Sequence, residues 1–374
     1  MIYLDYQATT PPAPEVIAAM RPWLEAQYGN PHSPHRLGRE AAAVIELARE
    51  HVAGALGDDG AGNLFFTFGA TEAANWALKG AAERLPRERR KIVTLATEHA
   101  CVLDTLEWLR TRGFEVDVLP VGPDGVVDPD LVAARVDGRT GLVAAMLVNN
   151  EIGVIQPIAS IGQIARAHGA LMFCDAVQAY GRVPVPLDSC DMVAMSAHKV
   201  HGPKGIGALW VRRGVTLEPL LHGGGQEGGL RSGTLSPALC VGFGEAAWLL
   251  TERFDADAAH VATLWRSARE ILGAEWHLNG SSEQRYRGNL NLRCDGLDAA
   301  RLISEVRKVA FSAGSACASG SGRSSHVLAA LGLPEREARS SIRLGFGRYT
   351  TLDELTQALD MILQAAERQR TFAS

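Results

Sequence analysis

Short apolar runs alternate with segments of helical period between positions 63 and 213. The apolar runs read "LFFTF", "KIVTLA", "FEVDVL", "LVAAMLV", "ALMFCD", "CDMVAMS" and "GALWVRR". Segments such as "ACVLDTLEWLRTRG" and "IASIGQIARAHG" separate several of them and repeat their apolar positions as a helix does. Strands that alternate with helices in this way predict an α/β domain with a mostly parallel sheet. In such a domain we expect functional side chains where the strands end.

The pattern changes after about Phe254. A long helical stretch is followed by a strand-like run, "GNLNLRC", a helix-like run, "LDAARLISEVRKV", another strand, "SSIRLGFGRY", and a closing helix from Asp353 to about Arg368. This order predicts a smaller α+β domain that the extreme N-terminus completes. We therefore expect a large domain over residues 14–254 and a small domain made of residues 1–13 and 255–374.

Composition narrows the classes of partner. The 374 residues are 47% hydrophobic, which is enough for a large core and more than one compact domain usually holds. The formal net charge is −5 and no long basic run is present, so no direct nucleic-acid ligand is expected. No apolar run has membrane-spanning length and none resembles a signal peptide. We expect a cytoplasmic protein whose six cysteines are reduced thiols.

A glycine turn at Gly69 joins the run "FFTF" to the helix-like stretch "ATEAANWALKG". The first turn of a helix has free backbone N–H groups, which favour a bound anion, and Ala70 and Thr71 would lie there. The turn is therefore a candidate phosphate site. On this stretch alone, an ordinary capped helix explains the pattern as well.

Polar residues follow two of the predicted strands. Asp175 ends "MFCD", and Ser196, His198 and Lys199 end "MVAMS" and its continuation "AHK". A carboxylate and an amine at one rim suit a cofactor with a basic ring nitrogen and an aldehyde. Taken singly, such residues more often cap helices or face solvent. The spacing of "HKVH" also fits a metal pair, but the following "GPKG" argues against the helix that would align the two histidines, so no metal site is expected.

Two further stretches are rich in glycine or in small residues. "HGGGQEGGLRSGTLS", from His222 to Ser236, resembles the oxyanion loop of esterases in its first four residues, but the chain has no G-x-S-x-G nucleophile. A glycine loop that approaches a ligand or another subunit and a plain flexible loop remain equally compatible with it. "FSAGSACASGSGRSS" surrounds Cys317 with residues that bury little apolar area, so we expect a mobile segment that carries a reactive thiol.

Ten ordered stretches carry a resemblance that covers nearly the whole chain. They are "YLDYQATTP", "GNPHSPHRLGREA", "FGATEAANWALKG", "TEHACVLDTL", "VNNEIGVIQPI", "CDAVQAYG", "SAHKVHGPKGIGALWVRR", "HGGGQEGGLRSGTL", "SAGSACASGS" and "SSIRLGFGRYTT". Together they closely resemble the cysteine desulfurases of the NifS/IscS type, which are pyridoxal-phosphate enzymes of the class V aminotransferase family. The resemblance implies the aspartate aminotransferase-like fold of these enzymes, with pyridoxal 5′-phosphate as the cofactor.

The same resemblance implies a role for each matching residue. Lys199 would hold the cofactor as a Schiff base, Asp175 would pair with its ring nitrogen, and His99 would stack on the ring and transfer protons. Arg343 and Asn150 would bind the substrate, and Cys317 would take its sulfur as a persulfide. The remaining cofactor contacts would come from Ala70, Thr71, Asn150, Gln178, Ser196, His198 and, across the interface of a homodimer, Thr234.

The function that the resemblance implies is the conversion of L-cysteine to L-alanine, with sulfur passed on to an acceptor such as an iron-sulfur scaffold or a sulfur-relay protein. A selenocysteine lyase and a class V aminotransferase are alternatives within the same cofactor family. An alternative of another class is a non-catalytic protein that keeps the fold to bind a sulfur carrier. That alternative predicts a damaged cofactor site, whereas every residue that the resemblance requires is present.

Overall fold

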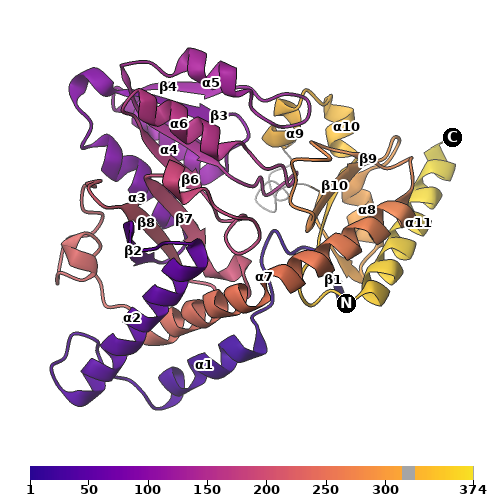
Figure 1. Ribbon diagram of the computed structural model, residues 1–374. Coiled ribbons are helices and arrows are strands. Elements are labelled where there is room, and N and C mark those ends of the chain that lie inside the picture. Colours follow the sequence, from indigo (N-terminus) through magenta and orange to yellow (C-terminus); the bar gives the residue numbers. More distant parts are fainter. Residues whose placement is uncertain (314–324, 374) are drawn as a thin grey trace.

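The computed structural model describes residues 1–313 and 325–373, which fold into a large lobe and a small lobe (Figure 1). A seven-stranded sheet lies at the centre of the large lobe. Its strands are β2 (Gly62–Thr67), β3 (Lys91–Leu95), β4 (Glu115–Leu119), β5 (Thr140–Met146), β6 (Leu171–Asp175), β7 (Met192–Ser196) and β8 (Gly207–Arg212). Each of the seven apolar runs predicted as a strand therefore forms one.

The strands lie in the order β2-β8-β7-β6-β5-β3-β4, and β8 alone runs against the others. The register places Met146 of β5 beside Asp175 of β6, and Asp175 beside Ala194 of β7. The carboxyl ends of the parallel strands consequently meet at one rim of the sheet. The prediction of an α/β fold with a mostly parallel sheet is confirmed.

Helices cover both faces of this sheet. On one face α3 (Ala70–Ala82) and α4 (Ala100–Thr111) pack on Met192 and Ala194 of β7. On the other face the helices pack on Val193 and Met195, which alternate with the first pair as the period of a strand requires. These helices are α2 (Arg36–Leu56), α5 (Pro129–Arg135), α6 (Ile158–Ala167) and the first half of α7 (Pro237–Leu272), with α1 (Pro14–Glu25) outside them.

The small lobe combines a three-stranded antiparallel sheet with helices. The sheet contains β9 (His277–Leu278), β10 (Asn289–Arg293) and β12 (Ser341–Gly345), and β1 (Ile2–Tyr3) pairs separately with β11 (Val309–Ala310). The helices are α8 (Ala299–Glu305), α9 (His326–Ala330), α10 (Glu335–Arg339) and α11 (Leu352–Ala373). The predicted helix over "LDAARLISEVRKV" is wrong in its last four residues, because the chain leaves the helix at Val306 to form β11 beside the N-terminal strand.

Helix α7 joins the two lobes (Figure 1). Its first half packs against α1 and α2 and its second half against α11, so it continues unbroken through position 254. The core of the small lobe is separate from that of the large lobe and includes Ile2 and Leu4. We propose that the two cores correspond to the two domains expected from the sequence, with their boundary inside this helix. Over the residues that the structure describes, no helix has the length and apolar character needed to cross a membrane.

Candidate functional site

A cavity of about 570 Å³ lies at the rim where the parallel strands end, a volume typical of small-molecule sites. It brings together most of the side chains that the sequence indicated, although they are spread over 130 positions of the chain. The predicted residues in its wall are Ala70, Thr71, His99, Asn150, Asp175, Gln178, Ser196, His198 and Lys199. The large lobe thus assembles one site from the ends of five different strands.

The helix start at Gly69 forms one end of the cavity. Gly69, Ala70 and Thr71 line it, and Gly69 makes no side-chain cap to the first turn of α3. Close packing shapes this turn, because a Cβ on Gly207 would lie 2.6 Å from the carbonyl oxygen of Met195 and 2.8 Å from the carbonyl carbon of Gly69. The free N–H groups of a helix start suit an anion such as a phosphate.

Lys199 is the last residue of the short helical turn η3 (Ala197–Lys199), which follows β7. Its Nζ donates hydrogen bonds to the carbonyl oxygens of Gln7 at 2.6 Å and Ala8 at 2.8 Å. Burial lowers the pKa of Lys199 to about 7, and the charges of Arg182 and Arg343 act in the same direction. A large share of this amine is therefore neutral at physiological pH, as a nucleophile for an aldehyde must be.

Asp175 is the last residue of β6, the strand next to β7, and it also lines the cavity. The side chain is 6% exposed, and Oδ1 accepts the backbone N–H of Val177 at 2.9 Å. Burial raises the pKa of Asp175, while His99 and Lys199 lower it in part. A buried carboxylate is stabilised by a cation close to it, so this position suits a ligand that carries a protonated nitrogen.

Two histidines of the cavity are held in defined orientations. His99 caps α4, where its Nδ1 accepts the N–H of Cys101 at 3.1 Å, so the neutral ring carries its proton on Nε2. His198 has its Nδ1 within 3.1 Å of Thr9 Oγ1. Burial is the main cause that lowers the pKa of His198 to about 4, and the charge of Lys199 is the next. The ring is therefore neutral beside the helix start.

The two predicted substrate contacts lie side by side. Arg343 of β12 is 1% exposed, and its Nη1 donates to the carbonyl oxygen of Asn150 at 3.0 Å. Its Nη2 donates to Asp5 Oδ1 at 2.8 Å, whereas its buried Nε has no hydrogen-bond partner within residues 1–313 and 325–373. Asn150 lines the cavity, and the guanidinium of Arg343 lies next to it through the hydrogen bond to its carbonyl oxygen.

Two further predicted residues are Thr234 and Cys317. Thr234 is exposed on the glycine-rich segment. Cys317 lies outside the described residues. Cys101 lines the cavity, but burial raises the pKa of its thiol far above the ordinary value, so it remains protonated and is a poor nucleophile.

Several contacts at the site have no counterpart in the sequence analysis. The carbonyl oxygens of Gln7 and Ala8 bind the amine of Lys199, and Gln178 Nε2 also donates to the carbonyl of Gln7 at 2.9 Å. Arg182 donates to Gln178 Oε1 and to the carbonyl oxygen of Lys199. Every residue has a backbone carbonyl, so the residue types in the sequence could not indicate these contacts. The carbonyls of Gln7 and Ala8 do lie within the motif "YLDYQATTP".

The second histidine of "HKVH" takes no part in the cavity. His201 has φ 66°, is buried, and has its Nδ1 within 2.9 Å of the carbonyl oxygen of Pro11. Among the residues that the structure describes, no group of three or more His, Cys, Asp and Glu side chains has the arrangement of a metal site.

Fold and site together define a class of protein: an enzyme of the α/β type with an amine, a carboxylate and an anion-binding turn around one cavity. The chain belongs to the class-V aminotransferase family, whose model matches residues 2–358. Members of this family use pyridoxal phosphate.

Individual relatives agree with this assignment. The chain is 42% identical over 377 residues to cysteine desulfurase IscS of Rickettsia bellii, an alignment that covers 99% of this chain and 92% of the relative. Among solved structures it is similar to a NifS-like protein, with a TM-score of 0.90, 35% identity, and 98% and 99% of the two chains covered. It is also similar to SspA in complex with cysteine, with a TM-score of 0.85, 36% identity, and 94% and 100% covered.

Proposed function

We propose that this chain is a cysteine desulfurase that converts L-cysteine to L-alanine and transfers the sulfur to Cys317 as a persulfide. The observation that carries the proposal is one cavity that holds the amine of Lys199 together with Asp175, His99 and the helix start of α3. The full-length similarity to proteins named cysteine desulfurase supports the choice of reaction, and the similarity to a structure with bound cysteine supports the choice of substrate.

The residues of the cavity fit pyridoxal phosphate. The first turn of α3, with Ala70 and Thr71, would bind the phosphate together with Ser196 and His198. Asp175 would bind the ring nitrogen, and the free proton on Gln178 Nε2 would reach the phenolic oxygen. When bound, pyridoxal phosphate supplies an aldehyde that condenses with amines and a ring that withdraws electrons from the substrate carbon.

Lys199 and His99 would handle protons in the reaction. The neutral amine of Lys199, when it is not bound to the cofactor, would be a base of suitable pKa for the α-proton of the substrate. His99 presents its Nε2 proton while its Nδ1 is fixed by Cys101, so it can donate without changing its orientation. The carbonyl oxygens of Gln7 and Ala8 would keep the amine of Lys199 at the cavity between these steps.

The sulfur step needs no outside oxidant or reductant. The thiolate of Cys317 attacks the substrate sulfur, a sulfur–sulfur bond forms, and the bond between sulfur and Cβ breaks with its electron pair left on the carbon side. A proton then completes alanine, so cysteine and a thiol become alanine and a persulfide. Arg343 would orient the substrate through its carboxylate, and its Nε, which has no hydrogen-bond partner among the described residues, would donate to that carboxylate.

The wider assembly belongs to the same proposal. We expect a homodimer in which Thr234, exposed in the isolated chain, binds the cofactor phosphate of the partner subunit. An acceptor such as an iron-sulfur scaffold or a sulfur-relay protein would then take the persulfide sulfur. A cytoplasmic location is proposed because Cys101, Cys174, Cys190, Cys240 and Cys294 are all free thiols, as a reducing compartment leaves them.

The substitution Cys317→Ser tests the reaction. The variant should keep the colour of the bound cofactor and lose nearly all release of alanine and sulfide from cysteine, because no thiol is present to accept the sulfur. Alanine and sulfide are measured after incubation with cysteine and a reductant, and mass spectrometry of the wild-type protein locates the added sulfur on residue 317. Cys101→Ser is the matched control and should retain turnover.

The alternatives predict other results. A class V aminotransferase would turn over the same substrate with Cys317→Ser as with the wild type. A selenocysteine lyase would prefer selenocysteine by a wide margin when the two substrates are compared. A non-catalytic carrier-binding protein would take up no cofactor and stay colourless.

A further inference from the structure

Strand β2 is an edge strand of the seven-stranded sheet, and one row of its backbone groups has no neighbouring strand. Side chains bond two of these groups instead. Arg49 Nη1 of α2 donates to the carbonyl oxygen of Leu64 at 2.7 Å, and Glu227 Oε2 accepts the N–H of Phe66 at 2.7 Å. A donor and an acceptor thus stand beside β2 where the next strand would place its own.

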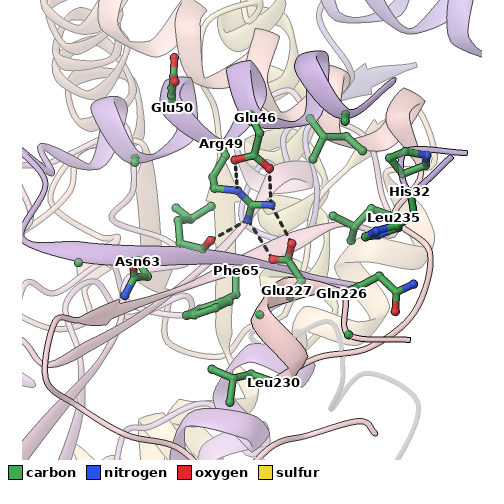
Figure 2. Close-up of a pocket in the computed structure, with 18 of the residues that line it drawn as sticks. His32, Glu46, Arg49, Glu50, Asn63, Phe65, Gln226, Glu227, Leu230 and Leu235 are labelled. Atoms are coloured by element: carbon green, nitrogen blue, oxygen red, sulfur yellow. Dashed lines mark hydrogen bonds and ion pairs between the residues drawn. The ribbon is translucent and has the colours of Figure 1, made fainter. Parts of the chain in front are cut away.

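The donor and the acceptor are themselves an ion pair (Figure 2). Arg49 donates to the two carboxylate oxygens of Glu227 at 2.9 and 2.7 Å, and the Glu227 side chain is only 2% exposed. Glu46, one turn earlier on α2, accepts from the other side of the guanidinium at 3.1 and 3.2 Å. The guanidinium also lies 4.9 Å from the centre of the Phe66 ring. These bonds fix the pair rigidly against β2.

Glu227 has a backbone conformation that side chains rarely adopt. Its φ is 50°, in the left-handed region, within the short turn η4 (Glu227–Gly229) of the glycine-rich segment. A residue other than glycine there costs on the order of 1–3 kcal/mol and persists only when the surroundings hold it. The bonds of its carboxylate to Arg49 and Phe66 are what hold it.

A second ion pair ties the same segment to the phosphate-binding turn. Arg231 donates to the carboxylate of Glu72 at 2.7 and 3.3 Å, and Glu72 follows Thr71 in the first turn of α3. On either side of Glu227 and Arg231 along the chain, Gln226 and Gly233 are joined, because Gln226 Oε1 accepts the N–H of Gly233 at 2.9 Å. The segment is therefore attached at two points to β2 and α3, the elements that form the anion-binding turn.

We infer that Glu227 and Arg49 are positioning residues for the cofactor phosphate. By replacing a neighbour strand on β2, they would fix the glycine-rich segment against the large lobe and so place Thr234, seven residues further on, for its contact with the cofactor phosphate bound by the partner subunit. This inference rests on the proposed function, because it requires that pyridoxal phosphate binds at the cavity. According to this inference, the ion pair between Glu227 and Arg49 affects the binding of the cofactor phosphate and has no effect on the binding of the cofactor ring.

An effect on phosphate binding can be separated from an effect on ring binding by measuring two dissociation constants. One is for pyridoxal 5′-phosphate, and the other is for pyridoxal, which lacks the phosphate. Cofactor-free dimer of the Glu227→Gln variant should bind pyridoxal 5′-phosphate roughly tenfold more weakly than the wild type, as the loss of one charge-assisted contact implies. Its dissociation constant for pyridoxal should be unchanged. Glu305→Gln, which removes a 2.7 Å ion pair to Arg301 on α8, is the matched control and should change neither constant.

A charge exchange tests whether the backbone contacts matter. In the double variant Arg49→Glu with Glu227→Arg the attraction between charges is kept, but neither side chain can bond its backbone group on β2. The double variant should remain as weak as Glu227→Gln or weaker for pyridoxal 5′-phosphate. Full recovery of wild-type affinity would show that charge alone matters and would overturn the part assigned to β2.

Other outcomes would overturn the inference as a whole. Equal weakening for both ligands in Glu227→Gln would indicate a general structural role. If that variant does not fold, as thermal unfolding would show, Arg49→Lys, which removes the two-point contact with Glu227, takes its place and must show the same selective loss. The proposed function fails separately, since a wild-type protein without bound cofactor or cysteine turnover refutes it whatever the variants do.

Discussion

The amine of Lys199 is the group whose chemistry depends most on its surroundings. Its side chain points from η3 to two backbone carbonyls, and burial together with two nearby arginines lowers its pKa to about 7. An amine with the ordinary pKa of 10.4 would be almost wholly protonated in the cell. The position of this one group therefore determines whether it can react with an aldehyde at neutral pH.

The capture of cofactor should depend on pH in a defined direction. With a pKa of about 7, roughly a tenth of the Lys199 amine is neutral at pH 6 and roughly nine-tenths at pH 8, so the rate of capture should rise about tenfold between them. The rise in visible absorbance after pyridoxal is added to cofactor-free protein measures this rate without a phosphate that titrates. A midpoint near pH 10 would contradict the described environment.

Most side chains of the site could be predicted from the sequence, whereas the neighbouring groups that position them and shift their pKa values could not. Asp175, Ser196 and Lys199 follow apolar runs and are chemically distinct, so both the strand ends and the resemblance indicated them. The effect of Arg182 on Lys199 arises from folding, because nothing in its local sequence relates it to a residue 17 positions away. The same holds for Arg343, whose burial next to Asn150 depends on how the two lobes meet.

At the scale of elements, the junction between β2 and α3 is set by the neighbouring strand. Gly207 begins β8, and any side chain there would collide with backbone atoms of Met195 and Gly69, which cannot turn away as a side chain does. The absence of a Cβ at this position therefore allows β8 to approach the anion-binding turn.

Gly207→Ala should displace the turn. We expect a loss of about 1–3 kcal/mol in unfolding free energy, as for other overpacked sites, and weaker binding of pyridoxal 5′-phosphate. Thermal or denaturant unfolding and a cofactor titration measure the two effects. Gly54→Ala, within α2 and with open space around its Cβ, is the control and should be neutral or slightly stabilising. Wild-type behaviour of Gly207→Ala would refute the steric account.

The elements themselves were predictable where local pattern determines them. Most strands of the large sheet are buried, continuous apolar runs, which are recognisable between the helical segments of the sequence. Strand β11 was not predictable, because its two residues become a strand only by pairing with Ile2 and Tyr3. A local reading extends the helix over them, and tertiary pairing overrides that preference.

At the scale of the whole molecule, the proposed homodimer places one contact to the cofactor on the other subunit. Thr234 is exposed in the single chain and absent from its own cavity, whereas Lys199 and Asp175 line that cavity together. Residues that serve the same site from different chains can complement each other in a mixed dimer. Residues of one chain's cavity cannot.

A mixture of Lys199→Ala and Thr234→Asp proteins should therefore regain activity. The aspartate repels the phosphate and the alanine removes the amine, so each protein alone should be nearly inactive, while a mixed dimer has one intact site. After random exchange of equal amounts, cysteine turnover should reach about a quarter of the wild-type rate, because half of the dimers have one of their two sites intact. The control mixture of Lys199→Ala and Asp175→Asn should stay inactive, and equal inactivity of both mixtures would contradict the shared site.

The carbonyls that hold the amine of Lys199 belong to the first ten residues, and those residues are fixed by strands from the opposite end of the chain. Ile2 pairs with Val309, and Asp5 forms a bridge to Gly345. The N-terminal residues leave the ribosome first during synthesis. They can pair with β11 and β12 only after almost the whole chain has been made. The reactive lysine acquires its complete set of contacts only in a nearly finished polypeptide, which limits how early a nascent chain can take up its aldehyde.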